Sequence, residues 1–139
     1  MAVKTQEINS LKKGLIAETK VISRFVELGH GVAQPIGGFH RYDILVDIGS
    51  TNNWKRVQIK TASIRNGCVG FPCVSHRADR SRTTYSVVDI DYVVAYCSDN
   101  NKYYIVPVAE ITRSEMKLRI MPAKNNMVKG VRDAKLYEL

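Results

Sequence analysis

The sequence contains no long hydrophobic run and few features of an exported or disulfide-bonded protein. No stretch approaches the roughly 18 apolar residues of a membrane-spanning helix, and Met1 to Lys13 lacks the apolar centre of a signal peptide. We therefore expect a cytoplasmic protein that does not enter a membrane. The three cysteines are odd in number and form no CxxC pair, which argues against a disulfide framework or a zinc ribbon. We expect reduced thiols, with Cys97 in a buried strand.

Acidic residues are also scarce relative to basic ones. The chain carries 21 Lys and Arg against 13 Asp and Glu, a formal net charge of +8. The commonest large polyanion that such a surface attracts is nucleic acid, and an acidic membrane is the alternative. A length of 139 residues with 45% apolar content predicts one domain, residues 1–139, that buries a core.

The first part of the chain predicts an amphipathic helix and an edge strand. Over residues 10–29, with Ser10 as the expected N-cap and Gly29 as the stop, apolar residues recur at helical spacing: Leu11, Leu15, Val21, Ile22, Phe25 and Val26. After the glycine turn, residues 32–35 can extend as an edge strand.

A β-hairpin is predicted next. Residues 41–48 alternate between two faces, with Tyr42, Ile44, Val46 and Ile48 toward the core and Asp43, Leu45 and Asp47 on the other side. Turn formers at 49–53 join this strand to residues 54–61, where Val57 and Ile59 oppose Arg56, Gln58 and Lys60.

The second half predicts a basic segment and another hairpin. Residues 62–86 show little periodicity and carry basic residues among Gly, Ser and Thr, which indicates an exposed basic excursion outside the core. Residues 87–96 and 103–108 are rich in Val, Ile and Tyr and flank turn formers, so they predict a hairpin that is central in the sheet. A short helical turn is expected after Pro107.

Four polar side chains interrupt the apolar patterns of consecutive elements: Glu18, Asp43, Gln58 and Lys60. Glu18 falls on the buried stripe of the helix, and Gln58 and Lys60 project from one face of a strand. If the hairpin brings Asp43 beside that pair and the helix packs across the same face, all four side chains meet. Two acids, an amide and a lysine suit a magnesium-dependent phosphodiester hydrolase. Oxygen ligands would hold the cation, and the lysine ammonium would neutralise negative charge on the phosphate.

Simpler interpretations exist for each acid. Glu18 could lie at the edge of the stripe, paired with Lys20 or Arg24. Asp43 could be one of the many strand carboxylates that face water.

The order of these motifs resembles the PD-(D/E)XK nuclease superfamily. The resemblance rests on Gly-Leu-Ile-Ala-Glu at 14–18, Arg-Tyr-Asp-Ile-Leu-Val-Asp at 41–47 and Val-Gln-Ile-Lys-Thr at 57–61. These stretches are most similar to the group I intron homing endonucleases, with Holliday-junction resolvases more distant. Residues 91–96 and 104–107 also resemble core strands of the homing branch. The fold so implied is α/β, with a restriction-endonuclease-like core and a mixed central β-sheet flanked by helices.

The resemblance also implies roles for the site residues. Asp43 would ligate one or two Mg²⁺ ions, with Gln58 and the Ile59 carbonyl as further oxygen ligands. Glu18 would hold a water of the metal, and Lys60 would orient the attacking water and stabilise the developing charge. Tyr42 stands where the family often has Pro, and Gln58 stands where it has Asp or Glu. The second departure removes one negative charge from the metal site.

The expected function is that of a site-specific DNA endonuclease of the homing type. The alternatives are a junction resolvase or restriction-type nuclease of the same fold, or a basic DNA-binding module without catalysis. Double-stranded DNA would be the partner, and a break in both strands calls for a homodimer or a homotetramer. The residues expected to neutralise phosphates are Arg41, Lys55, Arg56, Arg65, Arg77, Arg80 and Arg82.

Overall fold

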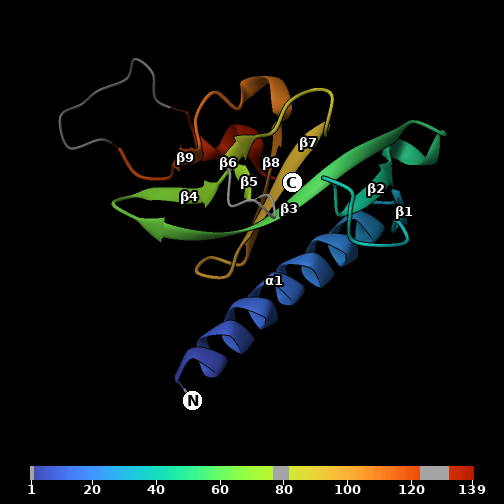
Figure 1. The fold of residues 1–139 in the computed structure, drawn as a ribbon. Coiled ribbons are helices and arrows are strands. Elements are labelled where there is room, and N and C mark those ends of the chain that lie inside the picture. The colour runs from blue at the N-terminus through green and yellow to red at the C-terminus, as the bar shows by residue number, and fades with distance from the viewer. Residues whose placement is uncertain (1, 77–81, 123–131) are drawn as a thin grey trace.

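A long helix lies across one face of a β-sheet in the computed structural model, which describes residues 2–76, 82–122 and 132–139 (Figure 1). The helix, α1, spans Ala2–Glu27, so it begins well before the predicted N-cap at Ser10. Residues 2–9 include good helix formers and no proline, and nothing in their sequence stops the helix. The N-terminal end of α1 projects beyond the sheet (Figure 1). Leu11 and Leu15, apolar residues of the predicted stripe, are 75% and 61% exposed, whereas Ala17, Val21 and Phe25 are buried. The buried face of α1 is therefore shifted from the predicted stripe.

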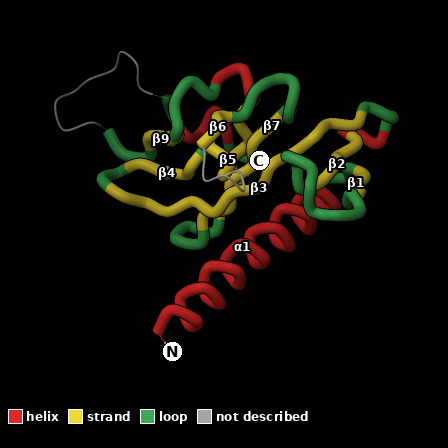
Figure 2. The backbone as a smooth tube through the Cα atoms, in the orientation of Figure 1, coloured by secondary structure: helices red, strands yellow, loops and turns green. Residues whose placement is uncertain are grey.

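The strands form one seven-stranded sheet and a separate two-stranded ribbon (Figure 2). The large sheet contains β1 (Gly31–Ala33), β2 (Ile44–Asp47), β3 (Trp54–Arg65), β4 (Cys68–Pro72), β7 (Tyr92–Cys97), β8 (Lys102–Pro107) and β9 (Glu115–Arg119). The ribbon contains β5 (Val74–His76) and β6 (Arg82–Thr84). The described residues also form three 3-10 turns, η1 (Ile48–Ser50), η2 (Val108–Glu110) and η3 (Ala134–Tyr137). The turn expected after Pro107 is therefore confirmed as η2.

The long strand β3 joins the parts of the sheet. Its first residues pair antiparallel with β2, as the predicted hairpin requires, and its last residues pair antiparallel with β4. Between these, β3 runs parallel to β7, which in turn pairs antiparallel with β8. The predicted mixed sheet is confirmed, and β7 is central as expected, whereas β8 pairs with β7 alone among the described strands. Instead of several flanking helices, the described residues contain one α-helix and the short turns.

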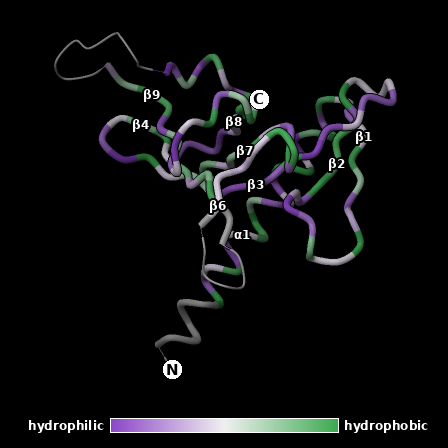
Figure 3. The backbone as a smooth tube through the Cα atoms, turned by 45° about the horizontal axis from the view of Figure 1, so that its top comes forward, coloured by the Kyte–Doolittle hydropathy of each residue, from purple (hydrophilic) through white to green (hydrophobic). Residues whose placement is uncertain are grey.

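Two apolar cores lie on the two faces of β3. On the α1 side, the buried residues are Ala17, Val21, Phe25, Ile44, Val46, Val57, Ile59, Val94 and Tyr96. The other core is built largely on β4, β7, β8 and β9. The turn between β3 and β4 is hydrophilic and lies outside both (Figure 3). Because side chains alternate along a strand, Gln58 and Lys60 face away from α1.

Part of the segment expected to be an exposed basic excursion belongs to the second core, so that expectation is wrong for the buried residues of β4 and its surroundings, whereas Arg65 is exposed. Val69, Phe71 and Cys73 are almost fully buried, and Tyr85 is 6% exposed. Their alternation is hidden in the sequence because glycine, proline and cysteine occupy β4 among the apolar residues. Val87 and Val88, predicted as strand residues, are exposed instead and precede β7.

The expectations for cysteine and membranes have separate outcomes. Cys97 is fully buried in β7 and all three cysteines are free thiols, as predicted. Among the described residues, no helix combines the length and apolar character that crossing a bilayer demands.

Candidate active site

Asp43 is fixed at the point where the chain enters β2. Its backbone N–H donates to the Val57 carbonyl at 2.8 Å, and its Oδ2 accepts a hydrogen bond from the Ile59 N–H at 2.7 Å. The hairpin register, which sets Ile44 opposite Val57, brings this about. The carboxylate is thereby held on β3 at the residue between Gln58 and Lys60.

The surroundings of Asp43 disfavour its negative charge in the absence of a cation. Burial raises the pKa of Asp43 above its ordinary value, and the Glu18 charge raises it further. The hydrogen bond from Ile59 and the positive charge of Lys60 act in the opposite direction. A divalent cation beside the carboxylate would offset both the burial and the repulsion from Glu18.

Glu18 meets Asp43 in a cavity of about 260 Å³. The remaining wall is formed by the loop between β1 and β2, through Gln34, Pro35, Gly37, Gly38, His40 and Tyr42. Gln34 Nε2 donates to Glu18 Oε1 at 3.1 Å, which orients the glutamate. We expected α1 to pack over the face of Gln58 and Lys60, but its core residues pack on the opposite face. Glu18 instead reaches Asp43 at the cavity.

The alternative interpretation of Glu18 as half of a helix ion pair is not supported. Arg24 pairs with Glu27 at 3.4 Å and donates to the Leu139 carbonyl at 3.1 Å. The Lys20 ammonium lies 5.8 Å from the centroid of the Tyr96 ring. Within the described residues, Glu18 forms no salt bridge with either of them.

Lys60 is half-buried on the face that is turned away from α1. Its Nζ donates to the Val74 carbonyl at 3.4 Å and lies 5.3 Å from the centroid of the Tyr85 ring. Burial lowers the pKa of Lys60, and the nearby Arg41 lowers it further, whereas the charge of Asp43 raises it. The acid and the ammonium are thus close enough to influence each other, on a strand that holds both in place.

Sequence reasoning missed Tyr85 and Gln34. The Lys60 ammonium lies over the Tyr85 ring, and the Arg41 guanidinium lies 4.9 Å from the centroid of that ring. Burial raises the pKa of Tyr85 to about 12, so its hydroxyl is neutral at physiological pH. The available signal was a lone aromatic residue in an otherwise polar stretch. Gln34 gave no signal, because its partner Glu18 lies on another element.

Gln58 lies half-buried on β3, on the same face as Lys60, and its side chain forms no hydrogen bond with the described part of the chain. Its amide oxygen is therefore available as a ligand. The Glu18 and Asp43 carboxylates line the cavity, whereas Gln58 and Ile59 are not among its lining residues and lie on β3, where the Ile59 N–H bonds to Asp43. Among the described residues, no group of three or more His, Cys, Asp or Glu side chains is arranged to hold a metal ion. An all-oxygen set with two carboxylates fits a hard cation such as magnesium.

The structure places the predicted DNA-contacting residues differently from one another. Arg41 pairs with Asp89 at 2.6 Å, and Arg56 pairs with Asp91 at 3.2 Å, so both guanidinium groups already bond within the protein. Lys55 is half-buried near one end of β3, and Arg65 is exposed at the other end. Arg77 and Arg80 lie outside the described residues, as does the side chain of Arg82.

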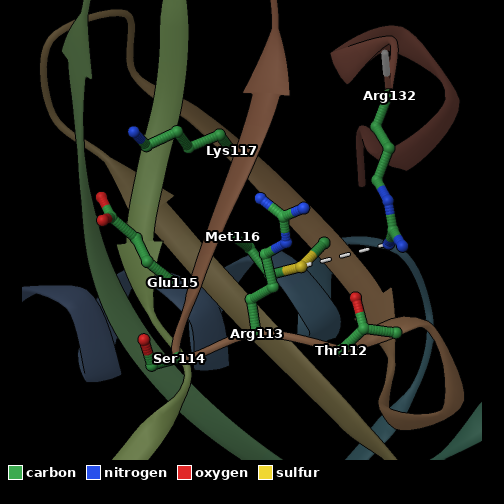
Figure 4. A pocket seen from close by; sticks show the side chains of 7 residues that line it. All are labelled: Thr112, Arg113, Ser114, Glu115, Met116, Lys117 and Arg132. Carbon is green, nitrogen blue, oxygen red and sulfur yellow. Dashed lines mark hydrogen bonds between the residues drawn. The ribbon is translucent and has the colours of Figure 1, made fainter. Parts of the chain in front are cut away.

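A larger cavity, of about 400 Å³, lies beside the start of β9, and none of the four predicted catalytic residues lines it (Figure 4). It is lined by residues 112–117 and Arg132. The Arg132 guanidinium donates to the Glu110 carbonyl at 2.6 Å and lies 4.0 Å from the Met116 sulfur. This arrangement ties the end of the chain to β9 and offers no pair of acids for a metal.

Comparison with known proteins identifies a sequence family and a similar solved structure. The sequence model of the PD-(D/E)XK endonuclease family matches residues 8–139. The fold is similar to the structure of a bacterial homing endonuclease, I-Ssp6803I, with a TM-score of 0.72 and 27% sequence identity. That match covers 91% of this chain and 86% of the other. No curated protein sequence matches this chain significantly.

Proposed function

The chain belongs to the PD-(D/E)XK endonuclease family, and from this we propose that it is a magnesium-dependent, site-specific DNA endonuclease of the homing type. The observation that carries the proposal is the meeting of Glu18 and Asp43 in one cavity, with Asp43 bonded to the residue that precedes Lys60. The 27% identity to a homing endonuclease over most of both chains supports the choice of the homing type. The net charge of +8 suits a DNA substrate.

The protein groups divide the chemical work. Asp43, Glu18, Gln58 and the Ile59 carbonyl would hold one or two magnesium ions, and Gln34 and the Ile59 N–H orient the two carboxylates. Magnesium in this position would supply positive charge to the scissile phosphate and make water a better nucleophile. Lys60 donates a hydrogen bond to the attacking water or to a phosphate oxygen, where negative charge grows in the transition state.

Cutting both strands at one site requires a second copy of this cavity. We therefore propose a homodimer or a homotetramer that places two cavities on the duplex by symmetry. Sedimentation of the protein with its DNA should show at least two chains per duplex. A monomer with and without DNA would contradict this part of the proposal.

The experiment that tests the function is cleavage of a library of duplexes with a randomised segment, in magnesium and in EDTA. A homing endonuclease cuts a small set of related long sequences, and only when the metal is present. Four-way junctions are included as a second substrate, because their preferential cleavage would identify a resolvase. DNA that is bound but uncut in every metal tested would identify a binding module without catalysis.

A further inference from the structure

Two large apolar side chains are almost fully exposed on the loop that forms the wall of the active-site cavity. Ile36 is 94% exposed and Phe39 is 83% exposed. Their loop neighbours Pro35, Gly37 and His40 line the cavity together with Glu18 and Asp43. Isolated exposed apolar residues are common, but here two of them flank a pair of glycines at the rim of the site.

The loop holds the Phe39 ring in a defined position. Its centroid lies 4.5 Å from that of His40 at an interplanar angle of 35°, and His40 lies 5.0 Å from Tyr42 at 30°. Gly37 has a φ of +89°, and a Cβ there would come within 2.9 Å of the Phe39 ring. Only glycine allows this turn to pass under the ring. The ring is thus supported by a row of aromatic side chains and remains open to solvent on its outer side.

An exposed aromatic ring supported in this way suits the face of a nucleobase. Proteins that deform DNA insert apolar side chains between base steps, and aromatic rings stack on unpaired or partly unstacked bases. A second copy of the chain or an apolar peptide could also cover Phe39, but neither explains why the ring lies between Gly38 and His40, which line the cavity where the phosphate would bind. A ring held in place before binding also loses little conformational freedom when it stacks.

We propose that Phe39, flanked by Ile36 and supported by His40 and Tyr42, contacts the bases next to the scissile phosphate and partly unstacks them. This inference rests on the proposed function, since the cavity must receive a phosphodiester for the bases to lie there. Base steps that unstack easily, such as pyrimidine–purine steps, should then be preferred at this position of the target. Part of the sequence preference would arise without hydrogen bonds to base edges.

The test uses a duplex recovered from the library experiment, with 2-aminopurine in place of the adenine nearest the cut and calcium in place of magnesium to prevent cleavage. Unstacking increases 2-aminopurine fluorescence, so wild-type protein and Phe39→Trp should both increase the signal. Phe39→Ala should lose most of that increase and bind the duplex about tenfold more weakly, as expected for one lost base–aromatic stack. Leu136→Ala is the matched control, because Leu136 is 81% exposed and lies in η3.

Several outcomes would overturn the inference. A full fluorescence increase and unchanged affinity in Phe39→Ala would show that the ring makes no base contact. A fall in oligomer size of Phe39→Ala without DNA would show that the ring contacts a second copy of the chain. If wild-type protein cuts nothing, the proposed function fails separately. In that case the affinity of Phe39→Ala for plasmid DNA in calcium, compared with Leu136→Ala, still tests the contact, and equal affinities would reject it.

Discussion

The Oδ2 atom of Asp43 accepts a hydrogen bond from the backbone N–H of Ile59 at 2.7 Å. This bond links the entry of β2 to the middle of β3 and fixes the carboxylate beside the two polar residues that flank Ile59. It also leaves a charged acid in a partly buried place, next to a second acid. The arrangement of these charges therefore lowers the stability of the folded protein, as is common at functional sites.

Replacement of Asp43 by Asn should stabilise the metal-free protein at pH 7. The pKa of Asp43 is raised in the folded state by burial and by Glu18, so the ionised form is less favourable there than in the unfolded chain. The penalty is present above the folded pKa and disappears as the pH falls through it. Thermal unfolding of both proteins from pH 7 downward should show a higher Tm for Asp43→Asn that converges with wild type in acid. A variant less stable than wild type at pH 7 would contradict this electrostatic account.

Gln58 should act through its amide oxygen. Gln58→Ala removes one ligand and opens the site, so most of the cleavage activity should be lost. Gln58→Glu restores the charge that the family usually has at this position, so it should cleave measurably and reach its half-maximal rate at lower magnesium. Rates across a magnesium titration distinguish these cases. If Gln58→Ala cuts at the wild-type rate at every magnesium concentration, Gln58 serves packing alone.

Tyr85 should position Lys60 through its ring and not through its hydroxyl. Tyr85→Phe keeps the ring and should cleave at nearly the wild-type rate. Tyr85→Leu removes the face that supports the ammonium and should slow cleavage about tenfold, within the range for a partly desolvated cation–π contact. DNA affinity in calcium should be unchanged in both variants, since neither alters a charge. Equal cleavage rates for Phe and Leu at this position would show that the ring is not needed.

Substitution of Arg56 should affect protein stability, whereas substitution of Lys55 should affect DNA binding. Arg56 donates to the Val87 and Val88 carbonyls as well as to Asp91, so Arg56→Gln should lower the free energy of unfolding by about 2 kcal/mol. Lys55→Gln should leave stability nearly unchanged and reduce the slope of DNA affinity against salt by about one. Urea unfolding and binding at several salt concentrations give the two numbers. The reverse pattern would assign Arg56 to the DNA.

Asp43 on the hairpin, and Gln58 and Lys60 on β3, could be located from the sequence because the position of each depends on a short-range rule. Alternation with a period of two places Val57 and Ile59 in the core, and the turn formers bring the preceding strand beside them. These two rules together put Asp43 next to Lys60. The roles of Gln58 and Lys60 in cleavage remain predictions.

The partners of charged and aromatic residues could not be located in this way. Arg41 pairs with Asp89, and Arg56 pairs with Asp91. The two partners of each pair are far apart in the sequence, so local patterns do not predict that they meet. The packing face of α1 also differs from the predicted stripe, since Ala17 and Val21 are buried while Leu11 and Leu15 are exposed. A periodic stripe indicates which residues share a face but not which of two adjacent faces packs on the sheet.

The most direct test of the central claim is single-turnover cleavage of the selected duplex by Asp43→Asn in magnesium, beside its affinity for the same duplex in calcium. Asp43 is proposed to hold the metal that assists hydrolysis, and Asn keeps an oxygen that can accept the hydrogen bond from Ile59. The account predicts that cleavage is abolished while affinity stays close to that of wild type, because the carboxylate acts on charge that develops during the reaction. Cleavage by Asp43→Asn at the wild-type rate would contradict the assignment of this cavity as the active site.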